Sequence, residues 1–292
     1  MRTDNSDTDF YLPVRDSFLN ESHKILSLIE DKDVFHEEKV HEIRKSLKRL
    51  KALLLLAKPV IHKKQVKHNY DILRESARYL TIYRETTANR TAYHDIFLTR
   101  DISVSHKHLQ KIQKYLFNET QKKYEKKSRK LIRIFSNIKI NILYILSQIE
   151  EVEHRFYTAE ELFNQIITSY NDYKAIYVKA DKKENAHLLH EWRKISKRLY
   201  YQIINGPFNA GKDETFIVSL DSLCDLLGND HDLFVLQNFI KKRNILSRKK
   251  IKSISKEINQ LRKSLQKDIF ITAKEIKGQS SSLIKLLEPK ED

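Results

Sequence analysis

The sequence contains few of the residues that interrupt helices. Its 292 residues include only four Gly and four Pro, well below average usage, so it has little of the chemistry that tight turns require. Apolar residues instead recur at three- and four-residue spacing along most of the chain, which is the period of an amphipathic helix. These patterns predict an all-α protein with helices longer than average. The length allows one large domain or two ordinary ones.

Two further absences bear on the setting of the protein. The one cysteine, Cys224, excludes an intramolecular disulfide and any Cys-based zinc cluster, and its apolar neighbours predict a small buried residue. The longest purely apolar run, ALLLLA at residues 52–57, is too short to cross a bilayer. Because the N-terminal MRTDNSDTDF also lacks a basic-then-apolar signal segment, we expect a cytoplasmic protein with no membrane partner.

Acidic residues are outnumbered by basic ones. The chain has 55 Lys and Arg against 39 Asp and Glu, which leaves a formal charge of +16 with His neutral. A charge of this size favours polyanionic partners such as nucleic acid, polyphosphate or an anionic membrane. A solvated basic surface would give the same composition, so composition alone does not choose between them.

One basic motif occurs twice. The string VHEIRKSLKRLKALLLL starts at Val40 and LHEWRKISKRLYYQII starts at Leu189, 149 residues later, and both contain His-Glu-x-Arg-Lys-x-x-Lys-Arg-Leu. The similarity continues beyond the motif, because DILRESARYLTIYRE at 71–85 aligns with VSLDSLCDLLGNDHD at 218–232, an offset of 147. A duplicated half-domain is the simplest architecture that explains both matches.

Each motif helix is predicted to carry its cations on one face. At ~100° per residue, the cations of the first motif lie within an arc of roughly 140° around its histidine, and the apolar residues lie opposite, facing a core. Neighbouring cations on a helix repel by about 0.2–0.5 kcal/mol per pair, so concentrating them favours a role in holding an anion. Arg offers a planar fork, Lys a flexible point charge and His a switchable donor. One such helix is adequately explained as a solvated face, but two matching helices favour anion binding.

Catalytic and metal-binding patterns are weaker. HEIRK and HEWRK begin like the zinc-protease string His-Glu-x-x-His, but Lys45 and Lys194 occupy the position of the second ligand. The stretch NAGKDET at 209–215 lacks the spacing and the preceding strand of a phosphate-binding loop, and no serine-elbow motif occurs. The residues therefore predict binding chemistry without a metal, a cofactor or an evident nucleophile.

The repeated strings resemble the two signature helices of the CHAD domain, the conserved histidine α-helical domain. ARYLTIYRE and DLLGNDHD resemble the segments that follow them in that family, commonly Leu-Gly-x-x-Arg-Asp and Leu-Gly-x-x-Asn-Asp, and SRKLIRIFSNIKINILYIL resembles the end of its first half. The resemblance covers roughly residues 11–277. It implies two four-helix bundles related by pseudo-twofold symmetry, with inorganic polyphosphate bound in a central channel lined by basic residues and histidines.

Carried over to this sequence, the resemblance implies two channel walls with additional ligands beside them. The implied polyphosphate-binding residues are His41, Arg44, Lys45, Lys48, Arg49, Lys51, Arg74, Arg84, His190, Arg193, Lys194, Lys197 and Arg198. The sequence departs from the family's pattern at four positions that affect the finer contacts, namely Thr81, Glu85, Tyr200 and His231.

The expected organisation follows the repeat. A disordered tail at 1–10 precedes a CHAD domain at 11–277, divided into halves at about 11–150 and 151–277, and a polar tail follows at 278–292. In the first half we expect helices at about 11–29, 36–57, 63–83, 87–99, 105–134 and 137–150. In the second, a capping box at Thr158 and Glu161 opens one helix, Gly206-Pro207 ends the second motif helix, and a long basic helical region covers about 232–277.

The leading hypothesis is a non-catalytic polyphosphate-binding protein, in the cytoplasm or associated with polyphosphate granules. The alternative is a nucleic-acid-binding protein, favoured by the basic stretch KKRNILSRKKIKSISK and the 14 tyrosines, although no recognised reading motif occurs. A histidine-dependent phosphoesterase ranks last, since Glu42 and Asp232 are the only suggestive carboxylates near the motifs.

Overall fold

The computed structural model describes residues 9–33, 35–97, 105–150, 155–182, 185–208 and 214–287. Within these ranges all regular elements are helices: α1 (Tyr11–Glu30), α2 (His36–Leu56), α3 (Lys63–Tyr79), α4 (Thr81–Phe97), α5 (His106–Tyr124), α6 (Ser128–Glu150), α7 (Ala159–Lys182), α8 (Ala186–Asn205), α9 (Thr215–Arg243), α10 (Arg248–Gly278) and α11 (Ser280–Leu286). The all-α prediction is therefore confirmed. No helix in the described ranges combines the length and apolar character needed to cross a membrane.

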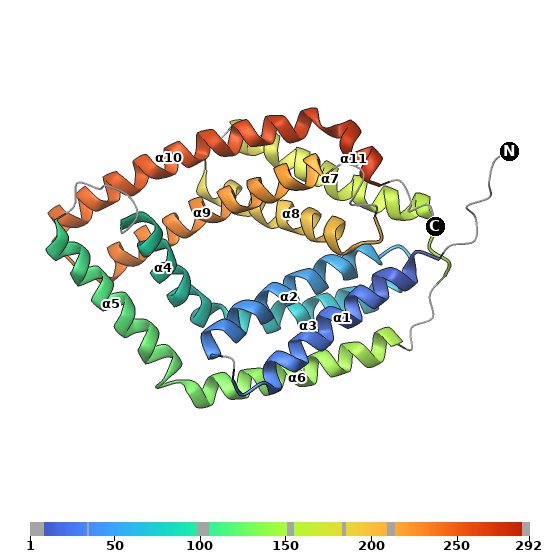
Figure 1. The fold of residues 1–292 in the computed structure, drawn as a ribbon, viewed down its shortest axis with the longest axis horizontal. Helices are drawn as coiled ribbons and strands as arrows, with labels where there is room; N and C mark the ends of the chain where they lie inside the picture. Colours follow the sequence, from blue (N-terminus) through green and yellow to red (C-terminus); the bar gives the residue numbers. More distant parts are fainter. Residues whose placement is uncertain are drawn as a thin grey trace.

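The two motif helices, α2 and α8, pack against each other at the centre of the molecule. Each has the same kind of neighbours, since α2 lies against α1 and α3 while α8 lies against α7 and α9. In Figure 1 the first-half helices α1, α2, α3 and α6 lie below, the second-half helices α7 to α10 lie above, and α4 and α5 connect them at one end. This order brings the basic faces of α2 and α8 near each other. The pseudo-twofold relation stays a prediction.

The core is formed by the apolar faces of the motif helices, as their periodicity predicts. Ile43, Leu47 and Leu50 of α2 are fully buried. On α8, Trp192 is fully buried and its ring lies 5.7 Å from that of Phe270 on α10. Burial of each such side chain contributes about 1.5–3 kcal/mol. Packing on one side of each helix thus fixes the direction in which its cations point.

Four boundaries differ from the sequence prediction. The break expected at residues 84–86 lies at Leu80, between α3 and α4. The break expected at residues 135–136 lies at residues 125–127, between α5 and α6. The helix expected to end near residue 232 continues to Arg243 and stops where Asn244 adopts a left-handed conformation with φ 47°, which Asn tolerates better than most residues. Beyond Lys277, where a polar tail is expected, α11 forms because Leu283 and Leu287 are one helical turn apart and both are buried. Residues 1–8 and 288–292 of the two predicted tails lie outside the described ranges.

The aligned segments at 71–85 and 218–232 differ in helix continuity. The first-half segment is split, with α3 ending at Tyr79 and α4 starting at Thr81. The second-half segment belongs to the uninterrupted α9, in which Gly228 aligns with Thr81 and is buried. A Cβ atom placed on Gly228 would lie 3.6 Å from Nε and 3.8 Å from Nη2 of Arg193, so Gly228 lies directly beneath that guanidinium.

Gly228 offers a test of this packing. Both distances to Arg193 are ordinary van der Waals contacts, and Gly in a helix interior costs about 0.5–1 kcal/mol relative to Ala. Gly228→Ala is therefore expected to raise the free energy of unfolding by about that amount in urea denaturation. Gly228→Leu should lower it, because a larger side chain must displace the guanidinium. Destabilisation by Gly228→Ala would contradict the observed spacing.

Candidate anion-binding site

The cations of α2 and α8 meet around Lys48. Burial, followed by the charges of Arg193, Arg44, Lys197 and Arg84, holds the pKa of Lys48 well below its usual value. These neighbours come from α2, α4 and α8, so segments that are distant in sequence converge here. Within the described residues Lys48 forms no ion pair. We call Arg44, Lys48, Arg84, Arg193 and Lys197 the central cation cluster.

Arg44 and Arg193 occupy equivalent motif positions but are held differently. Nη1 of Arg44 donates to the carbonyl oxygen of Ala77 and, over 3.1 Å, to Oγ1 of Thr81. Burial and the charge of Arg84 lower the pKa of Arg44 to about 10. Arg193 lies instead over Gly228, and its buried Nε has no hydrogen-bond partner among the described residues. A buried donor without an acceptor is costly, and the Nε atoms of Arg49 and Arg198 are in the same state.

One carboxylate, that of Asp232 on α9, lies among these cations. Burial raises its pKa, whereas the charges of Arg193, Arg84 and Lys48 act in the opposite direction. The net pKa is raised, so burial outweighs the favourable cations. Asp232 thus neutralises only part of the charge of the central cation cluster. From the sequence, Asp232 is only one of two suggestive carboxylates near the motifs, and its closeness to cations from three other helices cannot be read from local sequence.

Three histidines border the cluster. His190 on α8 stacks on His231 of α9, with ring centroids 4.2 Å apart and an interplanar angle of 25°. Burial and then the charge of His190 lower the pKa of His231 to about 3, and burial with nearby Lys194 lowers that of His190. The pKa of His41 is lowered by burial and then by Arg84. All three rings are therefore neutral at pH 7 and can accept a proton when an anion approaches.

Arg49 and Arg198, the last motif arginines, have carboxylate partners. Nη1 of Arg49 lies 2.5 Å from Oε1 of Glu21 on α1, and Nη2 of Arg198 lies 2.6 Å from Oδ2 of Asp172 on α7. The guanidinium of Arg49 also lies 5.8 Å from the ring of Tyr201 on α8. In both halves, therefore, the last motif arginine joins the motif helix to the helix that precedes it in the chain, α2 to α1 and α8 to α7.

The other predicted residues lie around the rim of the cluster. Lys51 is close enough to Arg44, Arg74 and Lys194 for their charges to lower its pKa after burial. Arg74 is exposed and pairs with Asp71 at 3.2 Å, and Lys194 pairs with Glu191 at 2.7 Å. Lys45 adds to the positive potential at His41. Within the cluster itself, Lys197 lies 3.8 Å from the carboxylate of Asp225.

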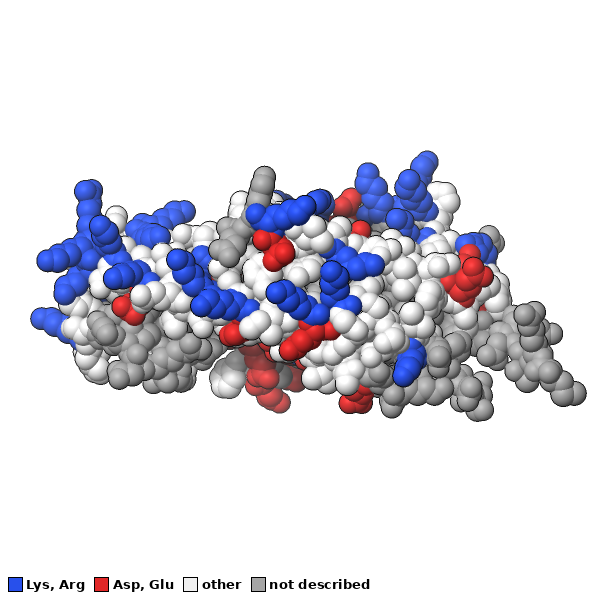
Figure 2. All heavy atoms as spheres, turned by 90° about the horizontal axis from the view of Figure 1, so that it is seen from above, with Lys and Arg blue, Asp and Glu red and all other residues white. Residues whose placement is uncertain are grey.

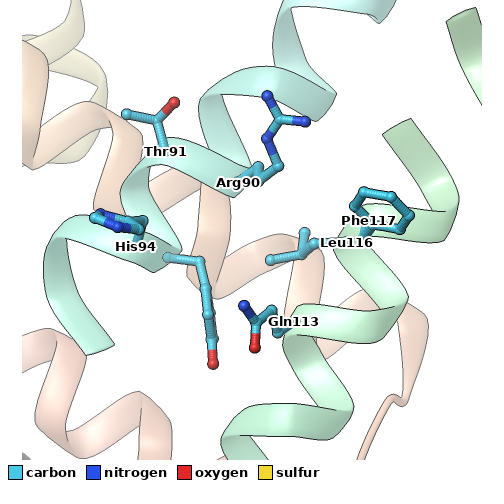
Figure 3. A pocket seen from close by; sticks show the side chains of 7 residues that line it. Arg90, Thr91, His94, Gln113, Leu116 and Phe117 are labelled. Carbon is cyan, nitrogen blue, oxygen red and sulfur yellow. The ribbon is translucent and has the colours of Figure 1, made fainter. Parts of the chain in front are cut away.

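A cavity of about 310 Å³ lies elsewhere, between α4 and α5. Leu116 and Gln113 point from α5 toward α4 in Figure 3. The cationic side chain on its wall, Arg90, is paired with Glu37 of α2. A largely apolar cavity whose arginine already has a carboxylate partner is poorly suited to phosphate, so this cavity is separate from the candidate site.

Comparison with known proteins identifies the family. A model described as the CHAD domain matches residues 27–241, and the chain belongs to the CHAD domain family. Two solved structures have a similar fold. PptA from Streptomyces chartreusis is 11% identical with a TM-score of 0.64, and the match covers 93% of this chain and 99% of that one. The CHAD domain from the plant Ricinus communis is 15% identical with a TM-score of 0.61, covering 98% and 95%. No curated protein matches the chain.

The lowered pKa of His231, which stacks on His190, allows a prediction of how the stability of the protein depends on pH. In the folded protein the pKa of His231 is about 3, below the ~6.5 of an unfolded histidine, so the unfolded chain binds more protons between these values. Stability present above pH ~6.5 is therefore lost as the pH falls toward 3. His231→Asn should reduce this loss, measured as the free energy of unfolding in urea at pH 7, 6, 5 and 4. His23→Asn, on the exposed surface of α1, is the control. Equal acid sensitivity of His231→Asn and the unmutated protein would contradict this assignment.

Proposed function

We propose that this protein binds inorganic polyphosphate at the central cation cluster, and that it does so without catalysis. The observation that carries the proposal is the environment of Lys48, which is half-buried among Arg44, Arg84, Arg193 and Lys197 and forms no ion pair with a described carboxylate. Concentrating charge in this way costs folding free energy. A bound polyanion would offset that cost by supplying the missing negative charge.

Polyphosphate suits this arrangement better than a compact anion. It is a flexible chain with a negative charge on each internal phosphate, so it can follow cations distributed over α2, α4 and α8. Arg193 would donate through its guanidinium, Lys48 and Lys197 would act as mobile point charges, and Arg84 would contribute from α4. The histidines would take up protons from water as the phosphates approach, which adds charge to the site only when it is occupied.

The thirteen side chains predicted from the resemblance contribute differently in this proposal. The central cation cluster would make the direct contacts, together with His41, His190, Lys45, Lys51 and Lys194 at its rim. Arg49 and Arg198 would mainly hold α2 and α8 in position through Glu21 and Asp172. Arg74, exposed beside Asp71, would contact only a chain that extends beyond the cluster.

A binding role also fits the two carboxylates considered for catalysis. Oε2 of Glu42 accepts a hydrogen bond from Lys24 of α1 at 3.1 Å, and Asp232 is surrounded by cations rather than placed beside a nucleophile. Among the described residues, no three His, Cys, Asp or Glu side chains are grouped to hold a metal ion. We therefore include in the proposal that neither carboxylate acts as an acid or base toward phosphate. An association with cytoplasmic polyphosphate granules would follow from the binding itself.

A competition assay tests the proposal. Labelled long-chain polyphosphate is titrated with the protein at physiological salt, with tRNA, duplex DNA and inositol phosphates as competitors. Arg44/Lys48/Arg193/Lys197→Ala is expected to lower the affinity by on the order of 10³-fold or more, because polyanion binding depends steeply on the number of cationic contacts. The nucleic acids are expected to compete poorly for this site.

The matched control removes the same number of charges from the outer surface of the first half. Lys63/Lys64/Lys67/Lys130→Ala changes four exposed lysines of α3 and α6 and should reduce the affinity much less. Circular dichroism verifies that both variants are folded. Equal losses in the two variants, or full displacement by tRNA, would mean that net charge rather than the central cation cluster determines binding.

A further inference from the structure

The outward face of α10 carries a second, separate concentration of cations. Over 29 residues of this helix, seven exposed lysines fall within an arc of about 80° at ~100° per residue, and at ~1.5 Å rise per residue the row extends for about 42 Å. We call this row the α10 lysine stripe; its members are Lys249, Lys252, Lys256, Lys263, Lys267, Lys274 and Lys277.

Most other residues of α10 lie on different faces, but Phe270 falls within the arc of the stripe by the same periodicity and is half-buried against Trp192. The isoleucines at 251, 254, 258, 269 and 276 are buried on the opposite side. The acidic residues Glu257, Asp268 and Glu275 project at about 80–100° from Lys249 by the same periodicity, outside the stripe. A helix that needed only solubility would mix both signs on its exposed face and gain from i,i+4 pairs. The segregation therefore indicates a surface suited to an anionic partner.

The acidic side chains that the structure describes do not neutralise the stripe. None of its lysines forms an ion pair within the described parts of the chain. Figure 2, which looks onto α10 from above the view of Figure 1, shows Lys and Arg side chains most densely gathered at the end where α9 and α10 meet, with others further along. Lys241, Lys242 and Arg243 at the end of α9 add to this positive end.

The stripe is distinct from the central cation cluster. The buried face of α10 packs mainly on α9, through isoleucines that lie opposite the stripe, such as Ile258 and Ile269. The lysines point away from that contact into solvent. Two polyanion surfaces therefore lie on different sides of the second half, one between helices and one on the outside.

The character of the stripe distinguishes among anionic partners. An anionic membrane would favour large apolar side chains beside the lysines, but the exposed large apolar side chain on α10 is Ile271 alone within the described residues. Single-stranded nucleic acid is held largely by bases that stack on exposed aromatic rings, and the described part of α10 exposes none. A flexible polyphosphate chain would lose conformational freedom on a convex surface that does not enclose it.

Double-stranded nucleic acid fits the stripe best. Its phosphates are already fixed along a stiff rod, with one charge per ~1.7 Å, and lysine contacts release condensed counterions without any need for base reading. A row of about 42 Å spans slightly more than one turn of the duplex, which is ~34 Å. We propose that the α10 lysine stripe binds the phosphate backbone of double-stranded nucleic acid without sequence specificity.

Fluorescence anisotropy of the full chain with a labelled DNA duplex of 24 base pairs, at 50 to 200 mM salt, tests this proposal. Lys252/Lys256/Lys263/Lys267→Gln should lower the affinity at least about tenfold and flatten the salt dependence, since each lost phosphate contact removes ~0.9 from the slope of log K against log salt. Lys63/Lys64/Lys67/Lys130→Gln, with equal charge loss on α3 and α6, should lower it less than about threefold. A second duplex of different sequence should bind equally well.

Three further arms decide the nature of the partner. Single-stranded DNA of the same length and vesicles containing phosphatidylserine should bind more weakly than the duplex. The variant Arg44/Lys48/Arg193/Lys197→Ala should retain most of the duplex binding, since the stripe is separate from the central cation cluster. Equal losses in the two lysine variants, tighter binding of single strands or vesicles, or loss of duplex binding in the central variant would each overturn the proposal.

Discussion

The contact of α2 with α8 is stabilised by hydrophobic packing and destabilised by repulsion between cations, and the rest of the structure depends on the balance of these two effects. Residues such as Leu47 and Trp192 are buried on the inner faces of these helices, and their packing fixes the helices in orientation. The same orientation brings Lys48 near Arg193 and Lys197, where burial and repulsion disfavour the charged lysine. Because stability is a small difference between large terms, this repulsion persists only where packing more than compensates for it.

Carboxylates on the surrounding helices reduce the repulsion between the cations of α2 and α8. Arg49 and Arg198 are turned toward Glu21 and Asp172 on the outer helices α1 and α7, so not all motif cations crowd the centre. Asp232 supplies one carboxylate from α9. The remaining positive charge is the part that the proposed polyphosphate ligand would neutralise. The α10 lysine stripe, by contrast, is exposed to water and salt, so its charges cost the fold much less.

Periodicity and the repeated motif were sufficient to predict much of the fold. They correctly placed α1 and α2 and the apolar faces of α2 and α8, because an amphipathic pattern directly reflects which side is buried. They misplaced the α5–α6 break and placed a helix boundary near residue 232, inside the continuous α9.

The sequence named the residues of the candidate site, but it did not predict which of them would pair with carboxylates and which would not. The helical period places all the motif cations on one face. Only the fold shows that Arg49 pairs with Glu21 while Lys48 lies among other cations. The His190–His231 stack likewise joins two helices through positions 41 residues apart in sequence. Such pairings depend on tertiary contacts. A single sequence does not reveal them, because His231 lies outside the repeated motif.

The central claim is that Lys48 is kept, at a cost in stability, for a polyanion. The most direct measurement is the free energy of unfolding of Lys48→Met beside the unmutated protein, with and without saturating polyphosphate. Without ligand the variant is expected to be more stable by about 1 kcal/mol or more, because a partly buried charge that forms no ion pair is replaced by an apolar side chain of similar length. With polyphosphate the unmutated protein should gain more stability than the variant. A less stable variant in the absence of ligand, together with equal gains on adding polyphosphate, would contradict the account.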